Sequence, residues 1–373
     1  MALGTCLQVD PRDLHHSEVH DDAVGSDTVP PEGSAVLAIE HFGFSSNNVT
    51  YAVFGDAMGY WGFFPGTDGW ARIPVWGFAR VLRSAHPGID EGARYYGYLP
   101  MATHLMVSPT DVSLSGFTDG AAHRTGRAAV YNRYIDCATD PVHQDRTEDL
   151  EMVFRPLFTT SFLLEDLLAD AAWFGADAVV LTSASSKTAY GTAQLLAARP
   201  DPRPAVVGLT SPANLSFVRS LGCYDRVLTY ADAASLPLGP TAVVDLAGDG
   251  EVITTLHTHL GDAVVHSSIV GATHWEAPPS DGADLPGATR SFFFAPDHLE
   301  QRRADWGPGG VEERFAVAWA SFVEHARSHI TVVHGDGPDA VRRVLEETLR
   351  GAVAPAVAHV LSMVGDDRGH LSA

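Results

Sequence analysis

Apolar and polar residues follow two different patterns along the chain, and the change lies near residue 155. Between residues 34 and 155, short alternating segments are broken by glycine and proline. This alternation predicts strands within 34–44, 73–84 and 92–109, and so an antiparallel, β-rich domain. The segment 155–174 is the first with the spacing of a long helix.

From residue 156 to about 290, short continuous apolar segments alternate with segments of helical period. Apolar strands of this kind are buried on both faces, as in parallel sheets that are covered by helices. Helices of roughly 10–15 residues between them indicate βαβ units. The pattern therefore predicts an α/β chain in which a doubly wound parallel sheet follows the β-rich domain, with strands at 177–183, 204–210, 226–230, 241–247 and 262–271.

The two ends of the chain differ from these domains. Residues 1–33 are acidic and rich in histidine, with little apolar periodicity, which indicates an N-terminal tail that is either poorly ordered or a strapping segment. Residues 291–373 predict an amphipathic helix over 310–328 and a second helix over 339–351, followed by a strand.

Charge and composition narrow the class of protein. With 24 basic and 46 acidic side chains, the net charge is −22, which argues against nucleic acid or an anionic membrane surface as a partner. We see no apolar run near the 18 or so residues of a membrane span, and no secretory signal. Cys6, Cys137 and Cys223 have neither the number nor the spacing of a disulfide framework or a CxxC zinc site. A cytoplasmic enzyme with a small-molecule substrate is expected.

Four segments carry a family signal when they are read in order. They are PVWGFARVLRSAHPGIDEGARYYGYLP (74–100), DAVVLTSASSKTAYGTAQLLA (177–197), SFVRSLGCYDRVLTYAD (216–232) and TAVVDLAGDGEVITTLHTHLGDAVVHSSIVG (241–271). Together they resemble the medium-chain dehydrogenase/reductase superfamily, in its zinc-free, quinone-oxidoreductase-like branch.

The resemblance implies a specific domain plan. It places a GroES-like substrate domain at 34–155 and a Rossmann-type nucleotide-binding domain at 156–290. The C-terminal segment 291–373 is expected to return to the first domain. The resemblance also implies a homodimer formed through the sheet edge at 262–271.

The turn over 183–188 departs from the superfamily, whose glycines let the backbone approach a pyrophosphate closely. Here Ser186, Lys187 and Ala189 stand at the glycine positions. Because a helix begins here, one interpretation is an altered phosphate-binding turn, made by Ser185, Ser186, Lys187 and Thr188. The other is that Ser185 or Ser186 only caps the helix and that Lys187 is solvated. Lys187 is the one lysine among the 24 basic residues.

The next predicted strand ends without the acidic residue with which NAD-preferring relatives hold the ribose. Between residues 199 and 226 four arginines oppose two aspartates, a local charge of +2. We therefore expect NADPH rather than NADH. The alternative interpretation is that Ser211 only caps a helix and that the arginines lie on the surface, where they keep the protein soluble. The candidate contacts to the 2′-phosphate are Thr210, Ser211, Asn214, Arg219 and Tyr230.

The resemblance implies that the loop 45–56 supplies polar groups to the reacting part of the substrate. The candidates are Asn47, Asn48 and Tyr51, with Tyr51 donating a proton or orienting a carbonyl. For the asparagines, turn formation is the alternative. No metal is expected, because residues 40–155 lack the cysteine-rich loop of the zinc-dependent relatives.

The leading hypothesis is a zinc-independent, NADPH-dependent reductase of an enone, quinone or ketone. A second hypothesis keeps the fold but uses Lys187 as the reactive group of a lyase or hydrolase acting on a carbonyl substrate. A third is a non-catalytic ligand-binding protein.

Overall fold

The chain divides into two units, and the computed structural model describes residues 3–271 and 285–365 of it. Unit 1 consists of Met1–Val153 and Thr331–Ala373, and unit 2 of Phe154–Ile330. The expected C-terminal segment 291–373 is therefore split, since its helical part up to residue 330 belongs to unit 2. Among the described residues, no helix combines the length and the apolar character that crossing a membrane requires.

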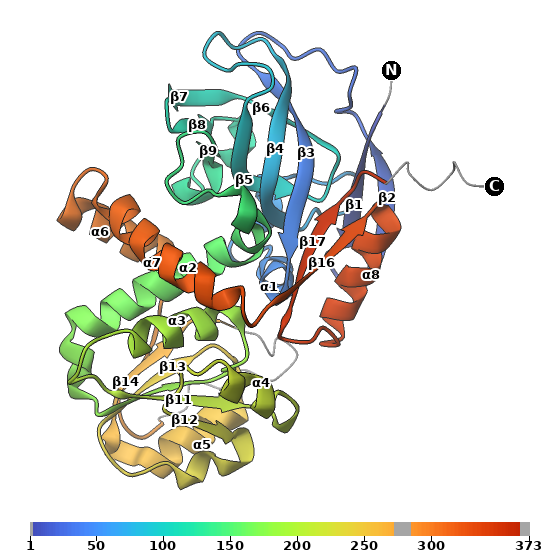
Figure 1. The fold of residues 1–373 in the computed structure, drawn as a ribbon. Coiled ribbons are helices and arrows are strands. Elements are labelled where there is room, and N and C mark those ends of the chain that lie inside the picture. Colours follow the sequence, from blue (N-terminus) through green and yellow to red (C-terminus); the bar gives the residue numbers. More distant parts are fainter. Residues whose placement is uncertain (1–2, 272–284, 366–373) are drawn as a thin grey trace. The chain divides into compact units, whose positions relative to one another are not determined.

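Unit 2 contains a six-stranded sheet in the order β12-β11-β10-β13-β14-β15, with every neighbouring pair parallel (Figure 1). The chain runs outward from β10 to β12 and then returns to β13 on the other side of β10, which is the predicted doubly wound order. The strands are β10 (Ala178–Leu181), β11 (Ala205–Thr210), β12 (Arg226–Thr229), β13 (Thr241–Asp245), β14 (Val264–Ile269) and β15 (Arg290–Phe292).

The edge of this sheet differs from the expectation. The segment 262–271 was expected to form the edge strand, but β15 pairs with β14 and covers it. A strand of three residues is too short for its pattern to stand out in the sequence.

Two groups of apolar side chains form the core of unit 2. Val180, Val207 and Val243 of the sheet pack with Ile253 and Leu256 of α5. Aromatic side chains join α2 to α7, where the rings of Phe158 and Phe322 stack at 4.5 Å between centroids. The helices are α2 (Glu148–Asp170), α3 (Lys187–Ala197), α4 (Leu215–Ser220), α5 (Gly250–Leu260), α6 (Ala295–Trp306) and α7 (Gly310–Ala326).

Unit 1 contains a nine-stranded sheet in the order β16-β17-β3-β4-β5-β9-β8-β7, with β6 paired to β3. Only β16 and β17 are parallel, so the predicted antiparallel, β-rich domain is confirmed. The elements are β3 (Ala35–Phe44), α1 (Ser46–Val53), β4 (Pro74–Ser84), β5 (Arg94–Pro100), β6 (His104–Val107), β7 (Pro109–Ser113), β8 (Gly116–Asp119), β9 (Arg133–Asp136), β16 (Thr331–Asp336), α8 (Pro338–Leu349) and β17 (Val357–Ser362).

The N-terminal segment is ordered, so the strapping segment is the alternative that describes this tail and the poorly ordered one is wrong. Its described residues form the hairpin β1 (Gly4–Asp10) and β2 (Asp13–Asp22), which lies beside α8 (Figure 1). Leu7 and Val9 are fully buried, and the N–H of Val9 donates to Ala71 at 2.9 Å. The polar residues that suggested disorder lie mostly on β2, whose side chains are largely exposed.

Unit 2 contains a turn in the left-handed conformation between α2 and β10. The φ angles of Ala172, Trp173 and Phe174 are 47°, 58° and 54°, and Gly175 follows at 74°. Each L-residue in this conformation costs about 1–2 kcal/mol. The ring of Phe174 stacks on His266 of β14 with 3.8 Å between centroids and 2° between planes, which offsets part of this cost.

We predict that Ala172→Gly stabilises the protein by about 1 kcal/mol, because glycine adopts positive φ without steric cost. The matched control is Ala304→Gly, since Ala304 is also exposed but lies inside α6. That control is expected to lose about 0.5–1 kcal/mol. Urea denaturation of both variants measures the difference. Destabilisation in both would show that the turn is not strained at Ala172.

Candidate functional site

The turn between β10 and α3 lies where the strand order of the parallel sheet reverses. β11 pairs with one side of β10 and β13 with the other, and α3 begins at Lys187 directly after the turn. In doubly wound sheets, ligands bind at the carboxyl ends of the strands at this point. The turn that sequence analysis singled out therefore lies at the expected position for a ligand.

The backbone of this turn offers hydrogen-bond donors to a ligand. Ser186 caps α3, since its Oγ accepts from the N–H of Ala189 at 3.3 Å. Ser183 has a φ of 48°, and its N–H donates to the hydroxyl of Tyr230 at 3.2 Å. Within the described part of the chain, the N–H groups of Ser185 and Thr188 have no acceptor. Two unsatisfied donors at the positive end of a helix suit an anion.

Lys187 is the first residue of α3 and is half-buried rather than solvated. Its Nζ lies 5.8 Å from the ring centroid of Phe154. Burial lowers the pKa of Lys187 to about 8, because the charged ammonium loses hydration. A bound anion would favour the charged form, so this side chain and the helix terminus would bind the same kind of ligand.

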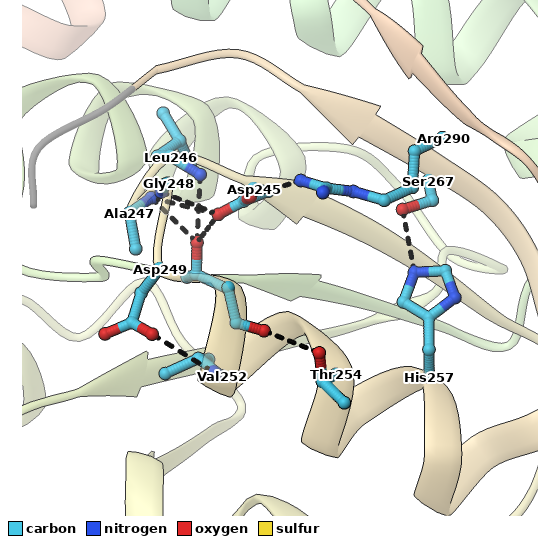
Figure 2. A network of polar contacts seen from close by, with 12 residues as sticks. Asp245, Leu246, Ala247, Gly248, Asp249, Val252, Thr254, His257, Ser267 and Arg290 are labelled. Carbon is cyan, nitrogen blue, oxygen red and sulfur yellow. Dashed lines mark hydrogen bonds and ion pairs between the residues drawn. The ribbon is translucent and has the colours of Figure 1, made fainter. Parts of the chain in front are cut away.

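A buried carboxylate organises the neighbouring strand ends (Figure 2). Asp245, the last residue of β13, is fully buried. Its Oδ1 accepts from Thr182 Oγ1 at 2.9 Å and from the N–H groups of Ala247 and Gly248 at 3.2 and 3.0 Å. Its Oδ2 lies 2.6 Å from Nη2 of Arg290 on β15. Burial raises the pKa of Asp245, and these donors and the guanidinium oppose that rise.

The loop that follows Asp245 is held by the same network. Thr182 Oγ1 accepts from the N–H groups of Leu246 and Ala247 at 2.9 and 3.0 Å. The N–H groups of residues 246–248 are thus used within the protein, and donors for a ligand come instead from the turn before α3. Sequence reasoning missed Thr182, Asp245 and Arg290. The signal that was available is the single acid that ends the apolar run TAVVD.

The other candidate cofactor residues of unit 2 divide into two groups. Asn214 and Tyr230 belong to the turn, since Asn214 Nδ2 donates to Ser185 Oγ at 3.0 Å and Tyr230 contacts Ser183. Thr210 lies at the end of β11, buried, and its Oγ1 has no partner among the described residues. Ser211 precedes a short 3₁₀ turn without capping it through its side chain, and Arg219 is exposed on α4.

The local positive charge near these residues is smaller than the sequence suggests. Arg199 pairs with the buried carboxylate of Glu165, with Nε 2.6 Å from Oε1. Arg203 pairs with Asp225, with Nη1 2.6 Å from Oδ2. Glu165 lies outside the window in which the charges were counted, so the +2 balance did not include it.

The candidate catalytic residues in unit 1 have structural partners, and the side chain of Asn47 is itself hydrogen-bonded to Tyr51. Asn48 is buried, and its Oδ1 accepts from the N–H of Ser45 while its Nδ2 donates to the carbonyl of Pro74, both at 2.9 Å. The turn-forming interpretation therefore describes Asn48. Tyr51 is also buried, and its hydroxyl accepts from Trp76 Nε1 at 3.2 Å. Asn47, on the first turn of α1, is half-buried.

Tyr51 belongs to an aromatic cluster within unit 1. Its ring lies 4.8 Å from that of Tyr60 and 5.5 Å from that of Tyr98, between centroids. The hydroxyl groups of Tyr60 and Tyr131 are 3.3 Å apart. Burial raises the pKa of Tyr51 well above its usual value, so the hydroxyl keeps its proton at neutral pH.

Three of the solved structures that match this chain illustrate its fold. CurA from Vibrio vulnificus in complex with NADPH matches with a TM-score of 0.63 and 12% identity, over 97% of this chain and 100% of that one. A mutant form of enoyl thioester reductase from Candida tropicalis matches with a TM-score of 0.60 and 10% identity, over 97% and 100%. The yhdH oxidoreductase from Salmonella enterica in complex with NADP matches with a TM-score of 0.53 and 13% identity, over 96% and 99%.

These likenesses establish the fold that the resemblance implied, a GroES-like unit and a Rossmann-type unit as in medium-chain dehydrogenases/reductases. None of the curated protein sequences matches this chain. A protein family model, described as "Protein of unknown function (DUF2855)", matches residues 42–354. The chain therefore belongs to this DUF2855 family, which here adopts the medium-chain dehydrogenase/reductase fold.

Proposed function

We propose that this protein is an NADPH-dependent reductase of an enone, quinone or ketone. The observation that carries the proposal is the turn before α3, which joins two unsatisfied N–H donors and a half-buried lysine at the switch point of the sheet. The proteins of the same fold that were solved with NADPH or NADP support it.

The donor set of the turn fits a pyrophosphate although the family glycines are missing. The left-handed φ of Ser183 makes the tight turn that glycine makes elsewhere. The N–H groups of Ser185 and Thr188 and the ammonium of Lys187 would hold the phosphate oxygens. Thr210, Ser211, Asn214, Arg219 and Tyr230 are the proposed contacts for the 2′-phosphate.

Bound NADPH would supply a hydride, and the chain's own groups would position the substrate. Tyr51 is proposed to orient the substrate carbonyl by donating a hydrogen bond to it, because burial raises its pKa and makes the hydroxyl a weak acid that keeps its proton. Asn47 is the proposed substrate contact. Asn48 is proposed to position the α1 turn, since both ends of its amide are already bonded.

The proposed reaction does not use zinc. Residues 40–155 contain a single cysteine, Cys137, and lack the cysteine-rich loop of the zinc-dependent relatives. We also propose a homodimer. Its contact in unit 2 would be the edge strand β15, where Phe292 is 61% exposed.

A second candidate function is lysine-dependent carbonyl chemistry. With a pKa of about 8, roughly a tenth of Lys187 is the neutral amine at pH 7, against less than about a thousandth for an ordinary lysine. A neutral amine attacks a carbonyl carbon and forms an imine with loss of water. This candidate is favoured if a carbonyl compound becomes attached to Lys187.

We predict micromolar binding of NADPH, at least about tenfold tighter than NADH. Lys187→Met is expected to weaken NADPH binding by about tenfold or more, because the charge on the phosphates is lost. Lys187→Arg is the matched control and should bind within a few-fold of the wild type. Nicotinamide fluorescence titration measures all three. No saturation by either nucleotide up to millimolar concentration would contradict the proposal.

The same lysine predicts a pH dependence. The bound phosphates favour the ammonium form, so NADPH affinity should fall as the pH rises from 7 to 9.5, through the pKa of about 8. In Lys187→Arg the guanidinium stays charged, and the affinity should change little over this range. An equally steep fall in both proteins would show that another group titrates.

Reduction with borohydride separates the two candidate functions. A carbonyl ligand fixed on Lys187 would add its mass irreversibly to the wild type and not to Lys187→Arg, as read by mass spectrometry of peptides. The reductase proposal expects no such adduct. It expects NADPH-dependent reduction of an enone, quinone or ketone that persists in Lys187→Arg.

A further inference from the structure

We propose that unit 1 contains a binding site for a divalent cation, Zn²⁺ in particular, formed by His143, Asp145 and Glu148. These residues come from the short 3₁₀ turn Asp145–Thr147, the loop before it and the start of α2. One potential ligand atom from each lies within 4.8 Å of the other two. The inference is independent of the proposed reductase function.

His143 is oriented as a metal ligand is. Its side chain is 8% exposed, and its Nδ1 lies 3.0 Å from Oε2 of Glu151, which is fully buried. A carboxylate bonded to one ring nitrogen fixes the imidazole and leaves the other nitrogen as the ligand. The other ring nitrogen, Nε2, faces the carboxylate of Asp145 at 3.5 Å, so the imidazole lies between two acids.

The second ligand is at the right separation from the first. Nε2 of His143 lies 3.5 Å from Oδ1 of Asp145. Two ligands at zinc–ligand distances of about 2.0–2.1 Å in a tetrahedral site are about 3.4 Å apart. The side chain of Asp145 is 99% exposed, so it is free to turn toward a cation without disturbing the core.

Glu148 is held in place by an arginine that does not occupy the whole carboxylate. Its Oε2 lies 2.8 Å from Nη1 of Arg94, whose Nε lies 2.6 Å from Glu40. A carboxylate has two oxygens and accepts several partners at once, so the same group holds Arg94 and a cation. Such a contact is typical of the second layer around a metal, where it orients the ligand.

The local charge favours a cation despite the positive end of α2. The first turn of this helix contains Glu148, Asp149 and Glu151, and Asp145 lies three residues before it. These four acids outnumber Arg94 and Arg146 and offset the helix dipole. One nitrogen and two carboxylate oxygens, with a position left for water, are a set that suits Zn²⁺ and, more weakly, Mn²⁺.

The test is a zinc titration of the full chain after treatment with a chelator, in competition with a chromophoric chelator. The site should bind one Zn²⁺ at micromolar concentration or below. Asp145→Asn should weaken this binding by more than about tenfold, and because Asp145 is exposed the variant should fold normally. His143→Gln should abolish it, with far-UV circular dichroism as the check on folding.

The matched control removes the histidines of another histidine-rich surface of unit 1, on β2. His16 and His20 flank Glu18 on β2, with Nε2 atoms 3.4 and 3.9 Å from its oxygens. The double variant His16→Ala/His20→Ala should bind Zn²⁺ at the His143 site as tightly as the wild type does. The proposal is overturned if this variant loses zinc binding while Asp145→Asn keeps it. It is also overturned if no saturable zinc binding is found up to about 100 µM, a concentration far above the dissociation constants of structural zinc sites.

Discussion

The buried carboxylate of Asp245 is the constraint on which the strand ends beside the proposed ligand site of unit 2 depend. Asp245 has no exposure to water, so its carboxylate must be matched by donors and by a cation. Its partners come from the end of β10, from the loop after β13 and from β15. Satisfying one charge therefore joins the ends of β10 and β13, where the sheet reverses its order, to β15 at the edge of the sheet.

This constraint also determines where a ligand finds its donors. Because the loop after β13 gives its N–H groups to Thr182 and Asp245, the turn before α3 is left as the place with unsatisfied donors. In the proposed function, a left-handed Ser183 and a half-buried Lys187 would take the place of the glycines that are usual in this fold. A side-chain charge would replace close backbone approach, so the proposed binding would depend on protonation to a degree that a glycine turn does not.

Unit 1 also contains buried polar side chains that hold their neighbours in place. Asn48 closes the first turn of α1 and bonds to β4, which places Tyr51 against its aromatic neighbours. Elsewhere in the unit, Glu151 is fully buried and orients His143 in the way that Asp245 orients Thr182. In both units a buried acid costs solvation free energy, and the gain is a neighbouring polar group held in one position.

The sequence by itself determined the fold class, the doubly wound sheet and the position of the turn before α3. These depend on apolar periodicity and on local capping, which neighbouring residues report. Sequence patterns did not find the hairpin at Gly4–Asp22, the three-residue β15 or the roles of Thr182, Asp245 and Arg290. Those were decided by tertiary structure. A polar strand is stable only when its other face packs on the core, and a buried charge is stable only where partners distant in the chain reach it.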